Sequence, residues 1–261
     1  MIGTVATVRE GPVLRIALDR VPKRNAFDIP MYEALSLALG QLERDPDLRC
    51  GVLVAHGDHF TGGIDLPQWT PFYRQGEAPP LPDGGLDPLG QTPGRILSKP
   101  LIAAVRGYCL TIGIELLLAA DIRIAAADTR FAQIEVKRGI FPVGGATIRF
   151  AQEAGWGNAM RWLLTGDEFD AAEALRIGLV QEVVPTGTET ARAMSIAGTI
   201  CAQAPLAVSA TLASGRDARI DGEQAAIARL LPALTRLLDT EDAQEGMAAF
   251  RERRPGRFTG R

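Results

Sequence analysis

The fold is decided by residues Lys99 to Thr147, which read KPLIAAVRGYCLTIGIELLLAADIRIAAADTRFAQIEVKRGIFPVGGAT. An apolar run from Leu101 to Val105 has the composition of a buried strand. A break at Gly113 opens a short helical run, and a second strand-like run extends from Asp121 to Ala127. The rest of the chain can be interpreted as what positions this stretch and brings a substrate to it.

Two carboxylates stand beside backbone turns in this apolar stretch. Glu115 falls in the first turn of the helical run, where the helix dipole favours an anion, so it could also serve only to stabilise the helix start. Glu135 lies in an apolar run, where burial would raise its pKa and suit it to general acid or base catalysis. The structural alternative is a salt bridge from Glu135 to Lys137, Arg138 or Arg123.

The remaining sequence predicts strands in the first half and helices in the second, hence an α/β core with a helical tail. We divide the chain into a core over residues 1–200 and a C-terminal helical region over 201–261. The segment Pro67 to Gly94 is rich in Pro and Gly and predicts a long loop or mobile lid. The other expected elements are a hairpin over 4–8 and 13–18, a helix capped by Asp28 that ends near Arg44, a strand over 50–55, helices over 145–154, 158–164 and 171–177, a strand over 179–184, and helices over 189–202, 205–214, 222–238 and 241–251.

Two turns could bind an anion through the backbone. Gly62 and Gly63 follow a strand, and glycine allows a ligand to approach exposed N–H groups closely. The simpler interpretation is a tight turn in which Asp65 caps the next helix. The helix start near Gly113 also has free N–H groups that suit an oxyanion.

Composition excludes several classes of function. The net charge of −3 and the pI near 5.6 give no basic field for nucleic acid. No apolar run approaches the roughly 20 residues of a membrane span, and the N-terminus does not resemble a secretory signal. Three widely spaced cysteines predict buried free thiols and fit a reducing cytoplasm; they are Cys50, Cys109 and Cys201. His56 and His59 lack companion ligands, so we expect no metal site.

The motifs, taken in order, resemble the crotonase family, the enoyl-CoA hydratase/isomerase superfamily. The resemblance covers nearly the whole chain. It is carried by residues 60–66 (FTGGIDL, against F-S-A-G-A-D-L), 99–108 (KPLIAAVRGY, against K-P-V-I-A-A-V-N-G-Y), 121–125 (DIRIA), 131–139 (against F-x-Q-P-E-V-x-x-G), 164–166 (LTG) and 172–180 (against A-x-E-A-x-x-x-G-L-V).

The resemblance implies a spiral of ββα units followed by helices used for assembly as a trimer or a dimer of trimers. It implies an acyl-CoA substrate, with coenzyme A as part of that substrate and no separate cofactor. By position, the thioester oxygen would be held by the N–H groups of Gly62 and Ile112, and Glu115 and Glu135 would be the catalytic pair. The resemblance also implies substrate contacts from Arg24, Ala26, Gly62, Gly63, Ile64, Asp65 and Ile112.

The sequence departs from the family pattern around the first glutamate. The family's A-L-G-G-G-C-E is here Cys109 to Glu115, CLTIGIE, so two glycines are replaced by Thr111 and Ile112. Ile134 replaces the proline before the second glutamate. Neither change removes an N–H or a carboxylate, but the added bulk predicts an altered acyl pocket.

Three functions remain open from the sequence. The first is an enoyl-CoA hydratase that adds water with both glutamates. The second is an enoyl-CoA isomerase, which needs one base to move a proton. The third is a non-catalytic acyl-CoA-binding protein, which the lost glycines would favour.

Overall fold

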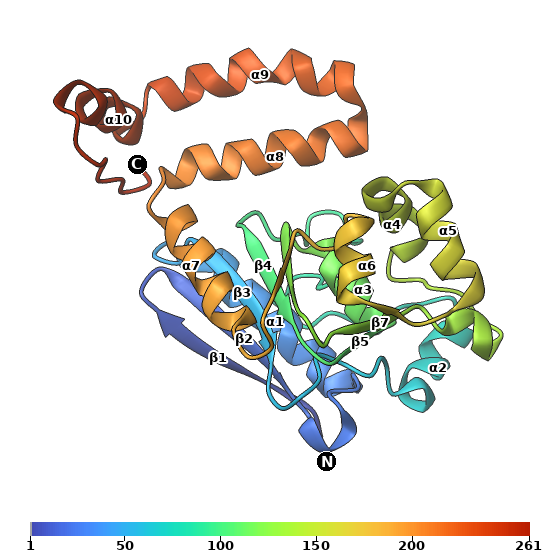
Figure 1. Cartoon of the computed structure of the whole chain (residues 1–261). Coiled ribbons are helices and arrows are strands. Elements are labelled where there is room, and N and C mark those ends of the chain that lie inside the picture. The colour runs from blue at the N-terminus through green and yellow to red at the C-terminus, as the bar shows by residue number, and fades with distance from the viewer. Residues whose placement is uncertain (1) are drawn as a thin grey trace.

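The computed structural model describes residues 2–261 and contains two sheets surrounded by helices (Figure 1). The larger sheet has the strand order β1-β2-β3-β4-β6-β9, in which only the β1–β2 pair is antiparallel. Its strands are β1 (Thr4–Glu10), β2 (Val13–Asp19), β3 (Cys50–Ala55), β4 (Leu101–Val105), β6 (Ile122–Ala126) and β9 (Glu182–Val184). The smaller sheet has the order β5-β7-β8, with β5 (Tyr108–Leu110), β7 (Arg130–Ala132) and β8 (Phe169–Asp170).

Helices cover both faces of the larger sheet. Helix α1 (Ile29–Arg44) packs against β1, β2 and β3, and α7 (Glu189–Cys201) packs on β3, β4 and β6. The other helices are α2 (Leu66–Arg74), α3 (Ile112–Ala119), η2 (Glu135–Arg138), α4 (Ala146–Ala154), α5 (Trp156–Thr165), α6 (Ala171–Arg176), α8 (Pro205–Asp221), α9 (Glu223–Leu238) and α10 (Glu241–Glu252), with a short turn η1 (Val21–Lys23).

The two faces of the sheet are buried in separate apolar clusters. In β2, Leu14, Ile16 and Leu18 face the larger cluster, whereas Val13 and Ala17 join the cluster that includes helix α7. Because side chains alternate along a strand, a sheet covered on both faces has strands that are apolar throughout. This explains why the central strands β3 and β4 are uninterrupted apolar runs.

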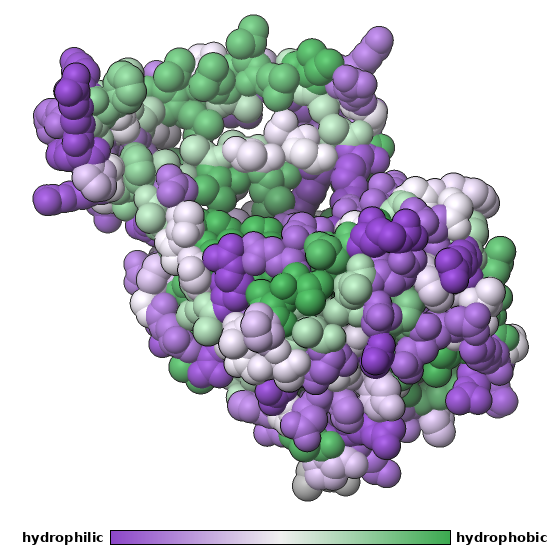
Figure 2. Space-filling model, viewed as in Figure 1, coloured by the Kyte–Doolittle hydropathy of each residue, from purple (hydrophilic) through white to green (hydrophobic). Residues whose placement is uncertain are grey.

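The C-terminal helices project away from the sheets (Figure 1). Helices α8 and α9 pack on each other, and hydrophobic side chains remain exposed along them (Figure 2). The large apolar residues exposed there are Leu206, Ile220, Ile227, Leu230, Leu231, Leu234 and Leu238. Within residues 2–261 no single helix is long and apolar enough to span a membrane. Helices α7 and α8 have the necessary length and composition only when they are taken together, and the chain bends by 108° between them.

Most of the expected elements are confirmed. The N-terminal hairpin pairs Glu10 with Val13, and the Asp28 side chain caps α1 by accepting a hydrogen bond from the Met31 N–H at 3.0 Å. All three cysteines are buried free thiols, as expected. Several bounds differ from the expected ones: β1 extends to Glu10, β9 begins only at Glu182, and α8 extends to Asp221. The segment predicted as loop from Pro67 begins in helix α2, because proline is well tolerated in the first turn of a helix. The three strands of the smaller sheet were not expected.

The Pro-rich segment after α2 is an irregular chain tied to its surroundings. Asp87 accepts hydrogen bonds from the N–H groups of Leu89, Gln91 and Thr92 at 2.8 to 2.9 Å. The Ser36 hydroxyl of α1 donates to the Leu86 carbonyl at 2.6 Å. These bonds organise the segment without regular secondary structure, which is why its composition resembles a loop.

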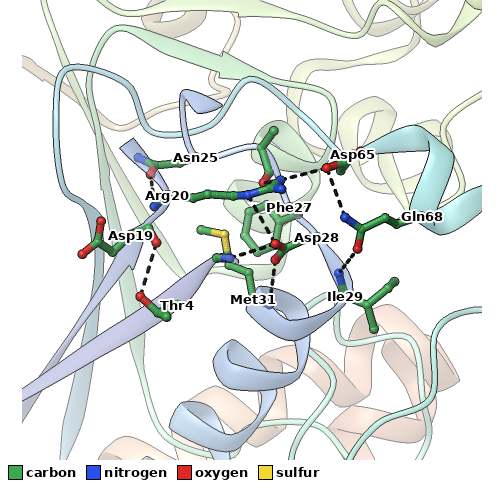
Figure 3. Close-up of polar contacts among 12 residues, drawn as sticks. Thr4, Asp19, Arg20, Asn25, Phe27, Asp28, Ile29, Met31, Asp65 and Gln68 are labelled. Atoms are coloured by element: carbon green, nitrogen blue, oxygen red, sulfur yellow. Dashed lines mark hydrogen bonds and ion pairs between the residues drawn. The ribbon is translucent and has the colours of Figure 1, made fainter. Parts of the chain in front are cut away.

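A buried ionic network joins three segments of the chain (Figure 3). The Arg20 guanidinium lies 3.2 Å from the Asp28 carboxylate and donates to Asp65 at 3.0 Å and to the Ala26 carbonyl at 2.9 Å. Asp28 also accepts from the Gly3 N–H at 2.8 Å. Arg20 and Asp28 are nearly inaccessible to solvent, so each charge depends on the other for its compensation.

We expect Arg20→Met to destabilise the fold by about 3–5 kcal/mol, because it leaves the buried Asp28 carboxylate without its counter-charge. Urea unfolding measures this as a lower midpoint. Arg192→Met is the matched control, since it breaks the exposed pair with Glu182 and should leave the midpoint nearly unchanged. Equal midpoints for the two variants would contradict the importance of the network.

Candidate active site

Both glutamates and both candidate anion-binding turns line one cavity of about 850 Å³. Glu115 is in the first turn of α3, and Glu135 begins the short helix η2. The turn after β3 contributes Gly62, Gly63 and Ile64, and the start of α3 contributes Thr111 and Ile112. Two stretches that lie about fifty residues apart in the sequence therefore meet in the same space.

Glu115 is almost completely buried, at 5% exposure. Burial raises the pKa of its carboxyl to about 7, although the nearby N–H groups of Ala146 and Gly144 favour the anion. The Ala146 N–H donates to Oε1 at 3.4 Å. Gly144 lies so close that a Cβ atom there would come within 2.3 Å of the Glu115 carboxylate, so the glycine allows this approach.

Within residues 2–261 Glu135 forms no salt bridge with Lys137, Arg138 or Arg123, contrary to the structural alternative for this residue. Lys137 pairs with Asp167, and Arg123 pairs with Glu153. The Glu135 Oε2 atom is buried without a hydrogen-bond partner among the described residues. Burial, and secondarily the charge of Glu115, raises the pKa of Glu135 to about 7.

The two carboxyls therefore share an electrostatic environment in which a single proton is favoured near neutral pH. Each resists ionisation because of burial, and the negative charge of Glu115 adds to the resistance at Glu135. Glu115 has backbone N–H groups and the positive charge of Arg149 to stabilise its anion. Since both pKa values lie near 7, protonated and ionised forms of both carboxyls are populated near neutral pH.

The N–H of Gly62 is not available to a ligand. It donates to the Arg24 carbonyl at 2.7 Å, which argues against Gly62 as the predicted oxyanion donor. Gly63 donates to the Thr61 hydroxyl at 3.1 Å. No described residue accepts a hydrogen bond from the N–H of Ile64, which also lines the cavity, so Ile64 supplies the free donor of this turn.

Parallel pairing brings the Ile64 turn beside the start of α3. Thr61 and Cys109 form a parallel bridge, so Ile64 and Ile112 each lie three residues beyond the same paired position. Ile112 is the first residue of α3, and its N–H has no carbonyl partner one turn earlier. Ile64 and Ile112, whose N–H groups have no acceptor among the described residues, thereby line the same cavity as Glu115.

Thr111 adopts a backbone conformation that is unusual for a β-branched residue, with φ 50° and ψ −113°. Such strain costs on the order of 1–3 kcal/mol. Its hydroxyl packs against Gly63, where a Cβ atom would lie only 2.6 Å from Thr111 Oγ1. Gly63, with φ 111°, therefore accommodates both the turn and the larger residue at position 111.

The other predicted substrate contacts are Arg24, Ala26 and Asp65, and each of them interacts with other parts of the chain. Arg24 is exposed, and its guanidinium lies 5.5 Å above the Tyr108 ring, while its carbonyl holds Gly62. The carbonyl of Ala26 accepts from Arg20. Asp65 does not cap α2 through its side chain; instead it pairs with Arg20 and accepts from Gln68, so it supports the turn.

Four aromatic side chains also line the cavity and were not anticipated from the sequence. Trp69 and Tyr73 come from α2, Tyr32 comes from α1, and Phe141 follows η2. Trp69 donates to the Phe27 carbonyl at 2.9 Å, which fixes its ring. The helical spacing of Trp69 and Tyr73 could have indicated a shared face, but the density of prolines concealed the helix.

The described residues contain no cluster of three or more His, Cys, Asp or Glu side chains able to hold a metal ion. His59 instead accepts a hydrogen bond from the Tyr108 N–H at 3.1 Å and stacks on the Tyr108 ring. This residue therefore supports the loop between β4 and β5.

The sequence is similar to those of known proteins over nearly its whole length. The profile of the family described as enoyl-CoA hydratase/isomerase matches residues 9–261. An enoyl-CoA hydratase of Mycobacterium tuberculosis is 35% identical over 97% of this chain and 95% of its own. A carnitinyl-CoA dehydratase of Salmonella enteritidis is also 35% identical, over 97% of both chains.

Solved structures agree over the whole chain. A probable enoyl-CoA hydratase/isomerase from Mycobacterium abscessus has a TM-score of 0.96 and 53% identity, covering 99% of each chain. An enoyl-CoA hydratase from Mycobacterium tuberculosis has a TM-score of 0.88 and 34% identity, covering 98% of this chain and 99% of that one.

We expect Glu115→Gln to stabilise the fold at pH 8 by up to about 3 kcal/mol and to have little effect at pH 4.5. The folded-state pKa of about 7 exceeds the ordinary 4.5, so the folded protein binds more protons between these values and loses stability as pH rises. Denaturant unfolding at both pH values measures the difference. Glu168→Gln is an exposed control, and an equal effect of Glu115→Gln at both pH values would contradict the raised pKa.

Proposed function

The chain belongs to the enoyl-CoA hydratase/isomerase family, and from that premise we propose that it adds water to a 2-enoyl-CoA thioester. The observation that carries the proposal is one cavity lined by two carboxyls of raised pKa and by Ile64 and Ile112, whose N–H groups have no acceptor among the described residues. Hydration needs an acid, a base and an oxyanion site, and these groups supply all three.

The amides of Ile64 and Ile112 hold the thioester oxygen in this proposal. Attack of water at C3 moves negative charge from the double bond onto that oxygen, forming an enolate. Two fixed N–H donors stabilise the enolate more than the neutral thioester, and losing one such donor typically costs roughly 3–4 kcal/mol. Ile64 takes the role that the sequence assigned to Gly62, whose N–H is engaged by Arg24.

The two glutamates divide the proton transfers. Glu115, whose anion is favoured by the amides and by Arg149, removes a proton from the attacking water. Glu135 carries the shared proton and delivers it to C2 as the enolate collapses. The atoms balance: water supplies OH to C3, one proton leaves Glu135 for C2, and the proton from water remains on Glu115 to re-equilibrate with the pair.

Isomerisation of a 3-enoyl-CoA is the second candidate function. A single carboxylate could move a proton between C2 and C4 beneath the same two amides. The two reactions differ in their products: hydration removes the conjugated double bond, whereas isomerisation creates it. The pairing of an acidic and a basic carboxyl favours hydration.

We also propose that the chain assembles as a homotrimer or a dimer of trimers through the projecting helices α8 and α9. Ile220 and Leu231 are each 74% exposed in the single chain. A continuous apolar surface of this kind is typical of an interface between subunits. Coenzyme A enters only as part of the substrate.

Either Glu115→Gln or Glu135→Gln should lower kcat for hydration of crotonyl-CoA by about 10²- to 10⁴-fold. The wild type should show a bell-shaped dependence on pH centred near 7, because the base is lost on the acid side and the acid on the alkaline side. Loss of the absorbance of the conjugated thioester measures the rate.

Longer enoyl-CoAs are assayed in parallel, and 3-enoyl-CoA with product analysis separates hydration from isomerisation. Wild-type turnover in Glu135→Gln would refute the two-carboxyl mechanism. Tight binding of acyl-CoA without turnover across the whole panel would instead favour a non-catalytic binding protein.

Light scattering should give a mass three or six times the 27.9 kDa of the chain. Ile220→Asp combined with Leu231→Asp should reduce this mass, because it buries charge in the apolar surface. Val8→Asp is the control, since Val8 is exposed on edge strand β1. A monomeric wild type would contradict the proposed assembly.

A further inference from the structure

The cavity contains one phenol that the proposed mechanism does not use. Tyr73 is in the last turn of α2 and lines the cavity together with Glu115 and Glu135. Its ring centroid lies 6.0 Å from that of Trp69, at an interplanar angle of 49°. Trp69 is held by its hydrogen bond to Phe27, so the Tyr73 ring rests on a fixed support.

The hydroxyl of Tyr73 has no hydrogen-bond partner among the described residues, and it is not among the buried unpartnered atoms. Tyr32 provides the contrast in the same cavity, because its hydroxyl donates to Asp87 at 3.2 Å. A phenol that is half-buried, accessible and unpaired is available to a bound molecule. The Tyr32 hydroxyl already donates its hydrogen bond to Asp87 and is not free to donate to a ligand.

The charges that act on Tyr73 are those of the two catalytic carboxyls. Burial, followed by the negative charges of Glu115 and Glu135, raises its pKa well above the usual range. Tyr73 therefore stays a neutral hydroxyl and can donate a proton in a hydrogen bond. It lines the same cavity as both carboxyls, where water would meet C3 in the proposed reaction.

We propose that Tyr73 donates a hydrogen bond to the oxygen at C3, which is the water before addition and the hydroxyl of the product after it. The inference rests on the proposed hydratase function. A water molecule that donates toward the carboxyls and attacks C3 with one lone pair has a second lone pair left to accept from Tyr73. In the reverse direction, the same bond assists departure of the hydroxyl group, so Tyr73 orients the oxygen without itself transferring a proton.

The test compares two ligands that differ at C3, using a Glu135→Gln background in which turnover is slow. Tyr73→Phe should weaken binding of one enantiomer of 3-hydroxybutanoyl-CoA by about 3- to 10-fold, the range of one neutral hydrogen bond. It should leave binding of butanoyl-CoA, which has no oxygen at C3, within about twofold. Isothermal titration calorimetry measures both affinities.

Tyr32→Phe in the same background is the control, because its hydroxyl belongs to Asp87. This variant should not alter the ratio of the two affinities, even where it changes stability. If Tyr73→Phe weakens both ligands equally, or neither, Tyr73 is only part of the apolar wall and the inference is wrong.

The proposed function fails separately from this inference. A wild type that hydrates no enoyl-CoA would overturn the proposed function. A selective loss of 3-hydroxybutanoyl-CoA binding in Tyr73→Phe would still support the contact with a C3 oxygen.

Discussion

The site depends on one buried guanidinium. Arg20 binds Asp28 at the start of α1, Asp65 at the start of α2, and the Ala26 carbonyl between η1 and α1. Helix α2 contributes Trp69 and Tyr73 to the cavity, and the turn before Asp65 contributes Ile64. Because the charges of Arg20 and Asp28 are inaccessible to water, the network has few alternative arrangements of low energy. It therefore fixes the turn before Asp65 and helix α2 together.

The second constraint is the parallel bridge between Thr61 and Cys109, which places two chain segments in register. Close packing beyond the bridge requires glycine at two positions. A Cβ atom would come within 2.6 Å of Thr111 at Gly63, and within 2.7 Å of Thr61 at Gly113. The glycines are retained at these contacts, whereas Thr111 and Ile112 occupy positions where a side chain fits, at the expense of backbone strain in Thr111.

The alternation of apolar runs and glycine breaks was enough to predict the strands of the larger sheet and most helices, but not β5, β7 and β8 of the smaller sheet. It also singled out Glu115 and Glu135, which line one cavity. The sequence could not show that the Gly62 amide is engaged by Arg24, because that bond joins segments 38 residues apart. Nor could it identify α2, where proline in the first turn mimics a loop. Local patterns predict elements, but the choice between Gly62 and Ile64 depends on long-range hydrogen bonds that no local pattern encodes.

The burial that disfavours ionisation of the two carboxyls also brings their pKa values close to neutral pH. Burial raises the pKa of both Glu115 and Glu135 to about 7, which is the range that the proposed acid and base need near neutral pH. The N–H groups of Gly144 and Ala146 favour the anion of Glu115. The anion of Glu135 is favoured by its own backbone N–H, while its Oε2 atom has no hydrogen-bond partner within the described residues. A buried oxygen of this kind lacks the hydrogen bond that most buried polar atoms have, so the unpaired Oε2 of Glu135 leaves a bond that a ligand in the cavity can supply.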